Sequence, residues 1–129
     1  MRFNSYLYLS LLLLSIFSCQ KEAGEGGNSS IHGKITVKEY SNGWFLGSYD
    51  GAEERVYIIY GDNNIYNDDM RTHFDGSYQF DYLYPGTYTI YTYTDCENCI
   101  SGKTMVSETV EITDKGQIVE VPEIVIEKY

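Results

Sequence analysis

The sequence predicts an all-β fold, either a sandwich or a barrel of seven or eight strands. From Ile31 onward, apolar and polar residues alternate with a period of two, and no helical period is present. Turn signals separate the alternating segments at short intervals, as in β-sandwiches and barrels. Tyrosine, a good strand former, supplies 14 of the 129 residues. Strands do not alternate with helices, which excludes a parallel sheet, and the length suits one domain.

The first predicted strand begins at Ile31 and is half-buried, because its apolar residues alternate with polar ones as far as Val37. Asn42-Gly43 is a strong hairpin signal. A short extra strand is expected over residues 44–46, and a compact β-rich run follows over residues 55–60.

The middle of the chain contains two further turn signals. Residues 70–74 and 77–83 flank Asp75-Gly76, which predicts a hairpin with a two-residue turn. Tyr84-Pro85-Gly86-Thr87 fits a type II turn, because proline fixes φ at the second position and glycine accepts positive φ at the third. Residues 88–94 consist of Thr, Tyr and Ile and predict the next strand.

Two strands are expected at the end of the chain, over residues 104–113 and 118–127, with a turn at Asp114-Lys115-Gly116 between them. Pro122 interrupts the second of these strands. Because proline has no amide hydrogen to donate, that strand should lie at an edge or contain a bulge.

The segment from Asp75 to Ile90 resembles the core motif of prealbumin-like sandwiches, which include carboxypeptidase regulatory-like domains and the B-type repeats of collagen adhesins. The resemblance implies an antiparallel Greek-key sandwich over residues 31–129 and says almost nothing about activity. The alternation itself predicts that five side chains point into the core: Tyr78, Phe80, Leu83, Tyr88 and Ile90. A buried tyrosine here should send its hydroxyl to a backbone partner.

The first 18 residues are typical of a signal peptide. Arg2 supplies the positive start, and the apolar run from Tyr6 to Phe17 follows. As a helix this run would be about 18 Å long. It is too short for a hydrocarbon core of about 30 Å.

The end of this run, Ser15-Ile16-Phe17-Ser18-Cys19, resembles the lipobox of bacterial lipoproteins. The resemblance implies that Cys19 becomes the lipidated N-terminus of an outer-membrane protein. The tripeptide Gln20-Lys21-Glu22 directly after Cys19 resembles the short signal that sends some Gram-negative lipoproteins to the outer face of the cell. The alternative is an ordinary signal peptide with a chance cysteine.

Residues 19–30 are predicted to form a flexible tether between the lipid and the domain. The stretch from Ala23 to Ser30 contains three glycines and no large apolar residue, so it has little surface to bury.

The formal net charge is −10, and it becomes −11 if Arg2 leaves with the signal peptide. An acidic surface repels phosphate backbones, so nucleic acid is not an expected partner.

Cys96 and Cys99 form the sharpest local motif, and an exported C-x-x-C most simply forms a disulfide. Metal binding or free thiols, and redox exchange, are the alternatives. Asp95 and Glu97 flank the pair and disfavour the thiolate that redox exchange needs.

Two further clusters are candidate sites. Residues 62–69 are rich in side-chain oxygens, which calcium prefers, so Asp62, Asn64, Asp68 and Asp69 form a candidate calcium site. The spacing does not match an EF-hand, and a solvated loop is the simpler interpretation.

Exposed tyrosines on one sheet face form a possible ligand surface for a sugar or a protein: Tyr57, Tyr91 and Tyr93. Ordinary cross-strand pairing would explain the same row.

No catalytic motif of the nucleophile-elbow, zinc-protease or phosphate-loop type is present in the sequence. The sequence therefore predicts a non-enzymatic, lipid-anchored envelope protein whose sandwich is a binding or structural module, without a cofactor unless calcium binds. The expected partners are the membrane and a glycan or envelope protein. The alternatives are a mechanical subunit of an outer-membrane uptake or adhesion complex, and a thiol–disulfide protein using Cys96 and Cys99.

Overall fold

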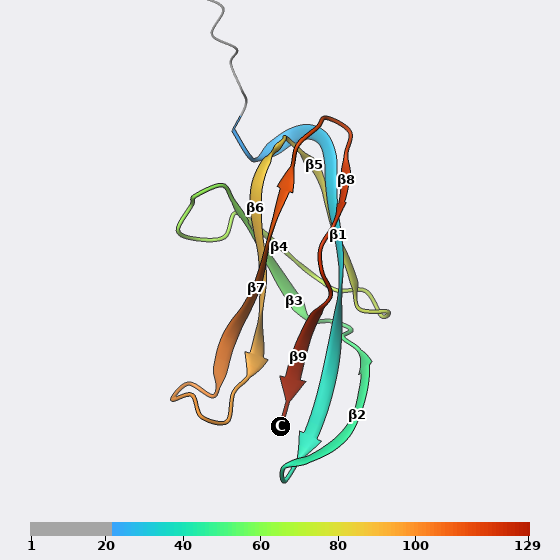
Figure 1. Ribbon diagram of the computed structural model, residues 1–129, viewed down its shortest axis with the longest axis vertical. Coiled ribbons are helices and arrows are strands. Elements are labelled where there is room, and N and C mark those ends of the chain that lie inside the picture. The colour runs from blue at the N-terminus through green and yellow to red at the C-terminus, as the bar shows by residue number, and fades with distance from the viewer. Residues whose placement is uncertain (1–21) are drawn as a thin grey trace, which may run out of the picture.

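The computed structural model describes residues 22–129, and these form nine strands in two sheets without a helix (Figure 1). The strands run in this order: β1 (Glu25–Ser41), β2 (Trp44–Asp50), β3 (Arg55–Tyr60), β4 (Asp68–Arg71), β5 (Ser77–Leu83), β6 (Gly86–Asp95), β7 (Lys103–Ile112), β8 (Ile118–Glu120) and β9 (Ile124–Lys128). The predicted all-β sandwich is confirmed, with one or two more strands than expected.

The five-stranded sheet is built around β1. Antiparallel β5 pairs with the first half of β1, and antiparallel β2 pairs with its second half. Strands β8 and β9 also pair with β1, and both run parallel to it. The chain leaves the ladder at Pro122, between β8 and β9, so the predicted interruption of the last strand is confirmed. The two parallel pairings were not expected from the sequence.

The four-stranded sheet has the order β4-β3-β6-β7 and is antiparallel throughout. Strands β6 and β7 form its longest pair, from Gly86 opposite Ile112 to Asp95 opposite Lys103. The sheet has one face on the core and one outer face, because side chains alternate along each strand.

The core lies between the sheets and contains the five side chains that alternation predicts. Tyr78, Leu83, Tyr88 and Ile90 are all at most 1% exposed, and Phe80 is 5% exposed. The hydroxyl of Tyr88 donates to the carbonyl of Tyr84 at 2.6 Å, which confirms the expected backbone partner.

The tether predicted for residues 19–30 is wrong for its second half, because β1 already begins at Glu25. Ser29 and Ser30 are buried. The Ser29 hydroxyl donates to the carbonyl of Asp114 at 3.0 Å, and the Ser30 amide donates to that of Gln117 at 2.9 Å. The small residues that suggested flexibility instead allow close backbone approach: a Cβ on Gly27 would lie 2.1 Å from the carbonyl oxygen of Leu83.

The hairpin predicted at Asp75-Gly76 is also wrong, because its two strands lie in different sheets. Strand β4 pairs with β3, whereas β5 pairs with β1. Gly76, with φ of +80°, therefore lies on a crossing between the sheets. A tight turn does form, but it runs from His73 to Gly76, whose amide donates to the His73 carbonyl at 2.9 Å, and turn chemistry does not determine which strands pair.

Two of the other turn predictions had opposite outcomes. Asn42 and Gly43 have φ values of +50° and +80°, the pattern of a type I′ turn, and they join β1 to β2 as predicted. The expected type II turn is not formed, since Gly86 has φ of +155° and is already the first residue of β6. A Cβ on Gly86 would lie 2.6 Å from the Cβ of Ala23, so glycine at this position allows the segment before β1 to lie close to the start of β6.

The predicted signal peptide, the lipidated Cys19 and the start of the tether lie outside the described residues. Within residues 22–129 no helix is long and apolar enough to cross a membrane.

Candidate functional site

Four tyrosines gather on the outer face of the four-stranded sheet. Tyr57 on β3 lies directly opposite Tyr91 on β6, and Tyr93 follows two residues later on the same face. Tyr66 comes from the loop between β3 and β4. We call these four residues the tyrosine cluster.

The rings of the tyrosine cluster contact one another. Tyr57 and Tyr91 stack with their centroids 4.8 Å apart and an angle of 12° between the planes. Tyr66 meets Tyr57 edge-on at 4.8 Å, and Tyr93 meets Tyr57 and Tyr91 edge-on at 6.0 and 5.9 Å. These are the arrangements that aromatic rings prefer, so the cluster holds its side chains in a fixed geometry.

The prediction that both Tyr91 and Tyr93 are exposed is wrong for Tyr91, which is only 8% exposed. Its neighbours cover it, and this burial raises the pKa of the Tyr91 phenol. Tyr66 and Tyr93 are 48% and 47% exposed and form the accessible rim. Tyr66 was not predicted to lie on this face, because no periodic pattern assigns a loop residue to a sheet face.

An ion pair borders the tyrosine cluster on β3 and β4. Arg55 pairs with Asp69, which lies directly opposite Tyr57 in the β3–β4 ladder. The pair places a guanidinium and a carboxylate beside the rings, so the surface offers apolar ring edges together with hydrogen-bonding groups.

The acidic loop uses several of its side-chain oxygens internally. Asn67 Oδ1 accepts from the Tyr60 amide at 2.8 Å and from Asn63 Nδ2 at 3.1 Å, and Asp68 accepts from the Asp69 amide. Across residues 22–129, no group of three or more histidine, cysteine, aspartate or glutamate side chains is placed to hold a metal ion. Calcium binding by Asp62, Asn64, Asp68 and Asp69 stays a prediction.

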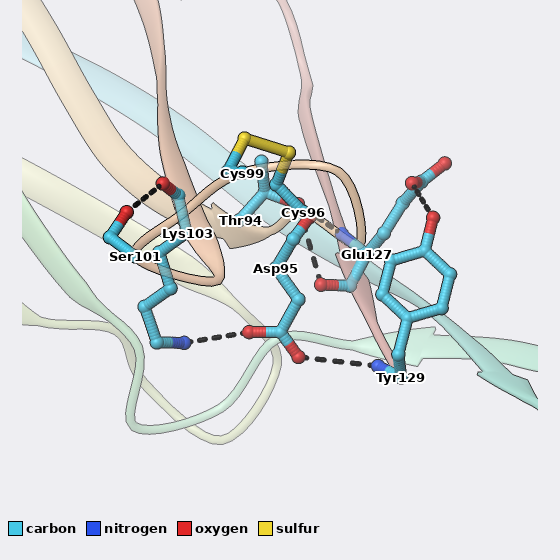
Figure 2. The surroundings of a disulfide bond; sticks show 8 residues. All are labelled: Thr94, Asp95, Cys96, Cys99, Ser101, Lys103, Glu127 and Tyr129. Carbon is cyan, nitrogen blue, oxygen red and sulfur yellow. Dashed lines mark hydrogen bonds and ion pairs between the residues drawn. A yellow bond between two sulfur atoms is a disulfide. The ribbon is translucent and has the colours of Figure 1, made fainter.

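A disulfide joins Cys96 to Cys99 in the loop between β6 and β7, as predicted (Figure 2). Next to it, the Asp95 carboxylate accepts from Lys103 Nζ at 2.7 Å and from the Tyr129 amide at 3.2 Å. The bond to Lys103 lowers the pKa of Asp95. The loop is therefore closed covalently and tied to the residue that follows β9, while an acidic residue lies on each side of Cys96.

Comparison with known proteins yields a structural likeness only. No family model matches the chain, and no curated protein matches it. Among solved structures, a protein from Pseudomonas aeruginosa named as a candidate carbohydrate-binding protein is similar, with a TM-score of 0.50 and 13% sequence identity. The match covers 99% of both chains. At this identity it supports the β-sandwich fold alone.

Proposed function

We propose that this protein is a non-catalytic, carbohydrate-binding lipoprotein of the outer membrane that binds a glycan through the tyrosine cluster. The tyrosine cluster carries the proposal. Rings with an apolar body and a polar hydroxyl can contact the C–H face of a sugar and hydrogen-bond its hydroxyls. The name given to the Pseudomonas aeruginosa neighbour agrees with this class of ligand.

The glycan is proposed to be neutral. The chain has a formal net charge of −10, which repels anionic polysaccharides at long range. At short range, the Arg55–Asp69 pair beside the rings is neutral as a whole and offers both donors and acceptors to sugar hydroxyls.

A binding assay on immobilised neutral polysaccharides tests the proposal. Tyr93→Ala and Tyr66→Ala remove the exposed rings and leave the buried Tyr91 in place. We expect each to weaken binding about tenfold, equivalent to about 1.4 kcal/mol. Phe74→Ala, which removes a ring that is 90% exposed on the loop between β4 and β5, is the control and should bind normally. Unchanged binding by both tyrosine variants would exclude the tyrosine cluster as the site.

The anchor is a separate part of the proposal. With β1 beginning at Glu25, only residues 20–24 separate Cys19 from the sandwich. The start of β1 lies at one end of the molecule, and the β1–β2 hairpin and the β6–β7 loop lie at the other (Figure 1). An anchored domain would thus stand close to the membrane with those two loops pointing away. Cys19→Ser should move the protein from the detergent phase to the aqueous phase; retention in detergent would contradict lipidation.

A mechanical subunit of an envelope complex is the second candidate, favoured by the exposed edge strand β2. Its Trp44, Phe45 and Leu46 side chains are 77%, 57% and 61% exposed. Unpaired edges with apolar side chains are sites where other chains add a strand. Co-purification of an envelope partner that is lost in Leu46→Lys, with glycan binding absent, would favour this candidate over the first.

A further inference from the structure

A β-bulge in β5 carries a strained and exposed aromatic residue. Ile31 pairs with Phe80 and Ser29 pairs with Leu83, so Asp81 and Tyr82 together oppose a single residue of β1. Tyr82 has φ of +59° and is 74% exposed. Positive φ is costly for a bulky side chain and is accepted without strain by glycine.

The fold explains the bulge but not the tyrosine. Because of the extra residue, the next side chain after Phe80 that points into the core is Leu83, three positions later instead of two. Leu83 is 1% exposed. Glycine or asparagine at position 82 would form the same bulge with less strain. A residue with a strained backbone and a largely exposed ring contributes little to packing, which indicates a role in binding and not in stability.

The bulge opens beside a shallow depression of about 360 Å³ on the outer side of the five-stranded sheet. It is lined by Asn28, Ser29, Ser30, Gln79, Asp81 and Tyr82. Gln79 and Asp81 face outward, because Tyr78 and Phe80 on the same strand face the core. The volume falls in the range of small-ligand sites.

The polar groups of this depression are held in place by their neighbours. Gln79 Nε2 donates to Asp81 Oδ1 at 2.5 Å, and Asn28 Oδ1 accepts from the Gly116 amide at 2.8 Å. The Ser30 hydroxyl lies 3.2 Å from His32 Nε2. Donors and acceptors that are fixed before binding reduce the entropy lost when a ligand binds.

We infer that this depression is a second binding site, for one neutral pyranose unit. The C–H face of the sugar would stack on the Tyr82 ring, while its hydroxyls donate to the Asp81 carboxylate and accept from the Asn28 and Gln79 amides. The Asp81 carboxylate disfavours anionic sugars. The site lies on the opposite sheet from the tyrosine cluster and does not depend on it, so it would engage a separate stretch of glycan.

NMR titration of the ¹⁵N-labelled full chain tests this site, with the methyl glycosides of glucose, galactose and mannose as probes. At least one probe should give saturable amide shifts centred on Asn28, Gln79 and Tyr82. Tyr82→Gly should abolish these shifts, and Asp81→Asn should weaken binding about tenfold. Phe74→Gly is the matched control for loss of an exposed ring and should leave the shifts intact.

The stability of Tyr82→Gly separates a binding role from a structural one. Because glycine adopts the observed φ freely, the midpoint of thermal unfolding should stay constant or rise while binding is lost. A lower midpoint, no shifts with any probe, or unchanged shifts in Tyr82→Gly would each overturn the inference. Tyr93→Ala should leave these shifts unchanged, so failure of the tyrosine cluster and failure of this site give different results.

Discussion

At the scale of single residues, glycines decide how closely strands approach at the centre of the five-stranded sheet. Along β1, pairing with β5 stops at Lys34 and pairing with β2 starts at Thr36, so Ile35 lies between the two partners. Its amide donates to the carbonyl of Gly76 and its carbonyl accepts from the amide of Gly51, both at 2.9 Å. The two glycines thus satisfy the backbone of a fully buried residue in the gap between two strands.

Gly76→Ala should therefore destabilise the protein by roughly 2–4 kcal/mol. The new Cβ would lie 2.4 Å from the Ile35 carbonyl oxygen, in addition to the strain at φ of +80°. Gly43 has the same φ but no atom within 4 Å of its would-be Cβ, so Gly43→Ala isolates the strain and should cost about 1 kcal/mol. Equal midpoints of urea unfolding for the two variants would contradict this account.

Two buried tyrosines provide a matched pair for hydrogen bonding. The Tyr88 hydroxyl donates to the Tyr84 carbonyl at 2.6 Å and accepts from the Gly24 amide at 2.9 Å. The Tyr78 hydroxyl has no hydrogen-bond partner within residues 22–129, and burial raises its pKa. Gly33 leaves room for that ring, since a Cβ there would lie 2.1 Å from the hydroxyl.

We expect Tyr88→Phe to lower the free energy of unfolding by about 1–2 kcal/mol, because two backbone groups lose a partner. Tyr78→Phe should be neutral or stabilising, since it removes a buried polar atom that makes no bond. Urea denaturation measures both. The prediction fails if Tyr78→Phe is the more damaging of the two.

At the scale of elements, the β6–β7 loop is fastened at three points. Cys96 is bonded to Cys99, and Asp95 holds both Lys103 at the start of β7 and the amide of Tyr129 after β9. The bond to Lys103 links β6 to β7, and the bond to Tyr129 links β6 to the end of β9 in the other sheet (Figure 2).

Stability should fall in acid partly through Asp95. Its pKa in the folded protein is lowered from 3.8, chiefly by the bond to Lys103. A lowered pKa means that the carboxylate stabilises the fold above its unfolded-state pKa and loses this contribution as the pH falls through the folded value. Asp95→Asn should therefore flatten the decline in thermal midpoint below about pH 4. An acid decline as steep as that of the unmodified protein would contradict the assignment.

The disulfide should contribute no more than about 2 kcal/mol, because it closes a very short loop. Backbone bonds also hold that loop, including the Cys96 amide to the Gly102 carbonyl at 2.8 Å. The double variant Cys96→Ser, Cys99→Ser should fold and unfold cooperatively at a slightly lower urea concentration. Failure to fold would show that the loop organises the sandwich, which is contrary to our expectation.

At the scale of the whole molecule, the first and last strands close the fold. Strand β9 lies parallel to the second half of β1, from Ile35 opposite Ile124 to Glu39 opposite Lys128. Its amide at Glu127 also donates to the Thr94 hydroxyl on β6 at 2.7 Å, so β9 reaches the second sheet.

Truncation after Glu123 should abolish cooperative folding. Ile124 and Ile126 are each 1% exposed, and burial of one such side chain contributes about 1.5–3 kcal/mol. Their loss, together with the β1 ladder, approaches the total stability of a typical domain. Deletion of Tyr129 alone removes its stacking on Tyr40 and its hydrogen bonds to Asp95 and Glu127, and should leave a cooperative transition. A cooperative transition in the longer truncation would contradict this role for β9.

The sequence was sufficient to predict properties that depend only on residues close together in the chain. Period-two alternation predicted an all-β sandwich and placed Tyr78, Phe80 and Ile90 in its core. The turn at Asn42-Gly43 followed from residues that accept positive φ. The grouping of Tyr57 and Tyr93 followed from the same alternation, because it assigns side chains to faces.

Only the tertiary structure decided which segments pair. It extended β1 back to Glu25, separated β4 and β5 into different sheets, set β8 and β9 parallel to β1, and brought the loop residue Tyr66 to the tyrosine cluster. It also revealed the strained Tyr82 beside its depression. These features depend on contacts between residues far apart in the chain, whereas alternation and turn chemistry record only local preferences.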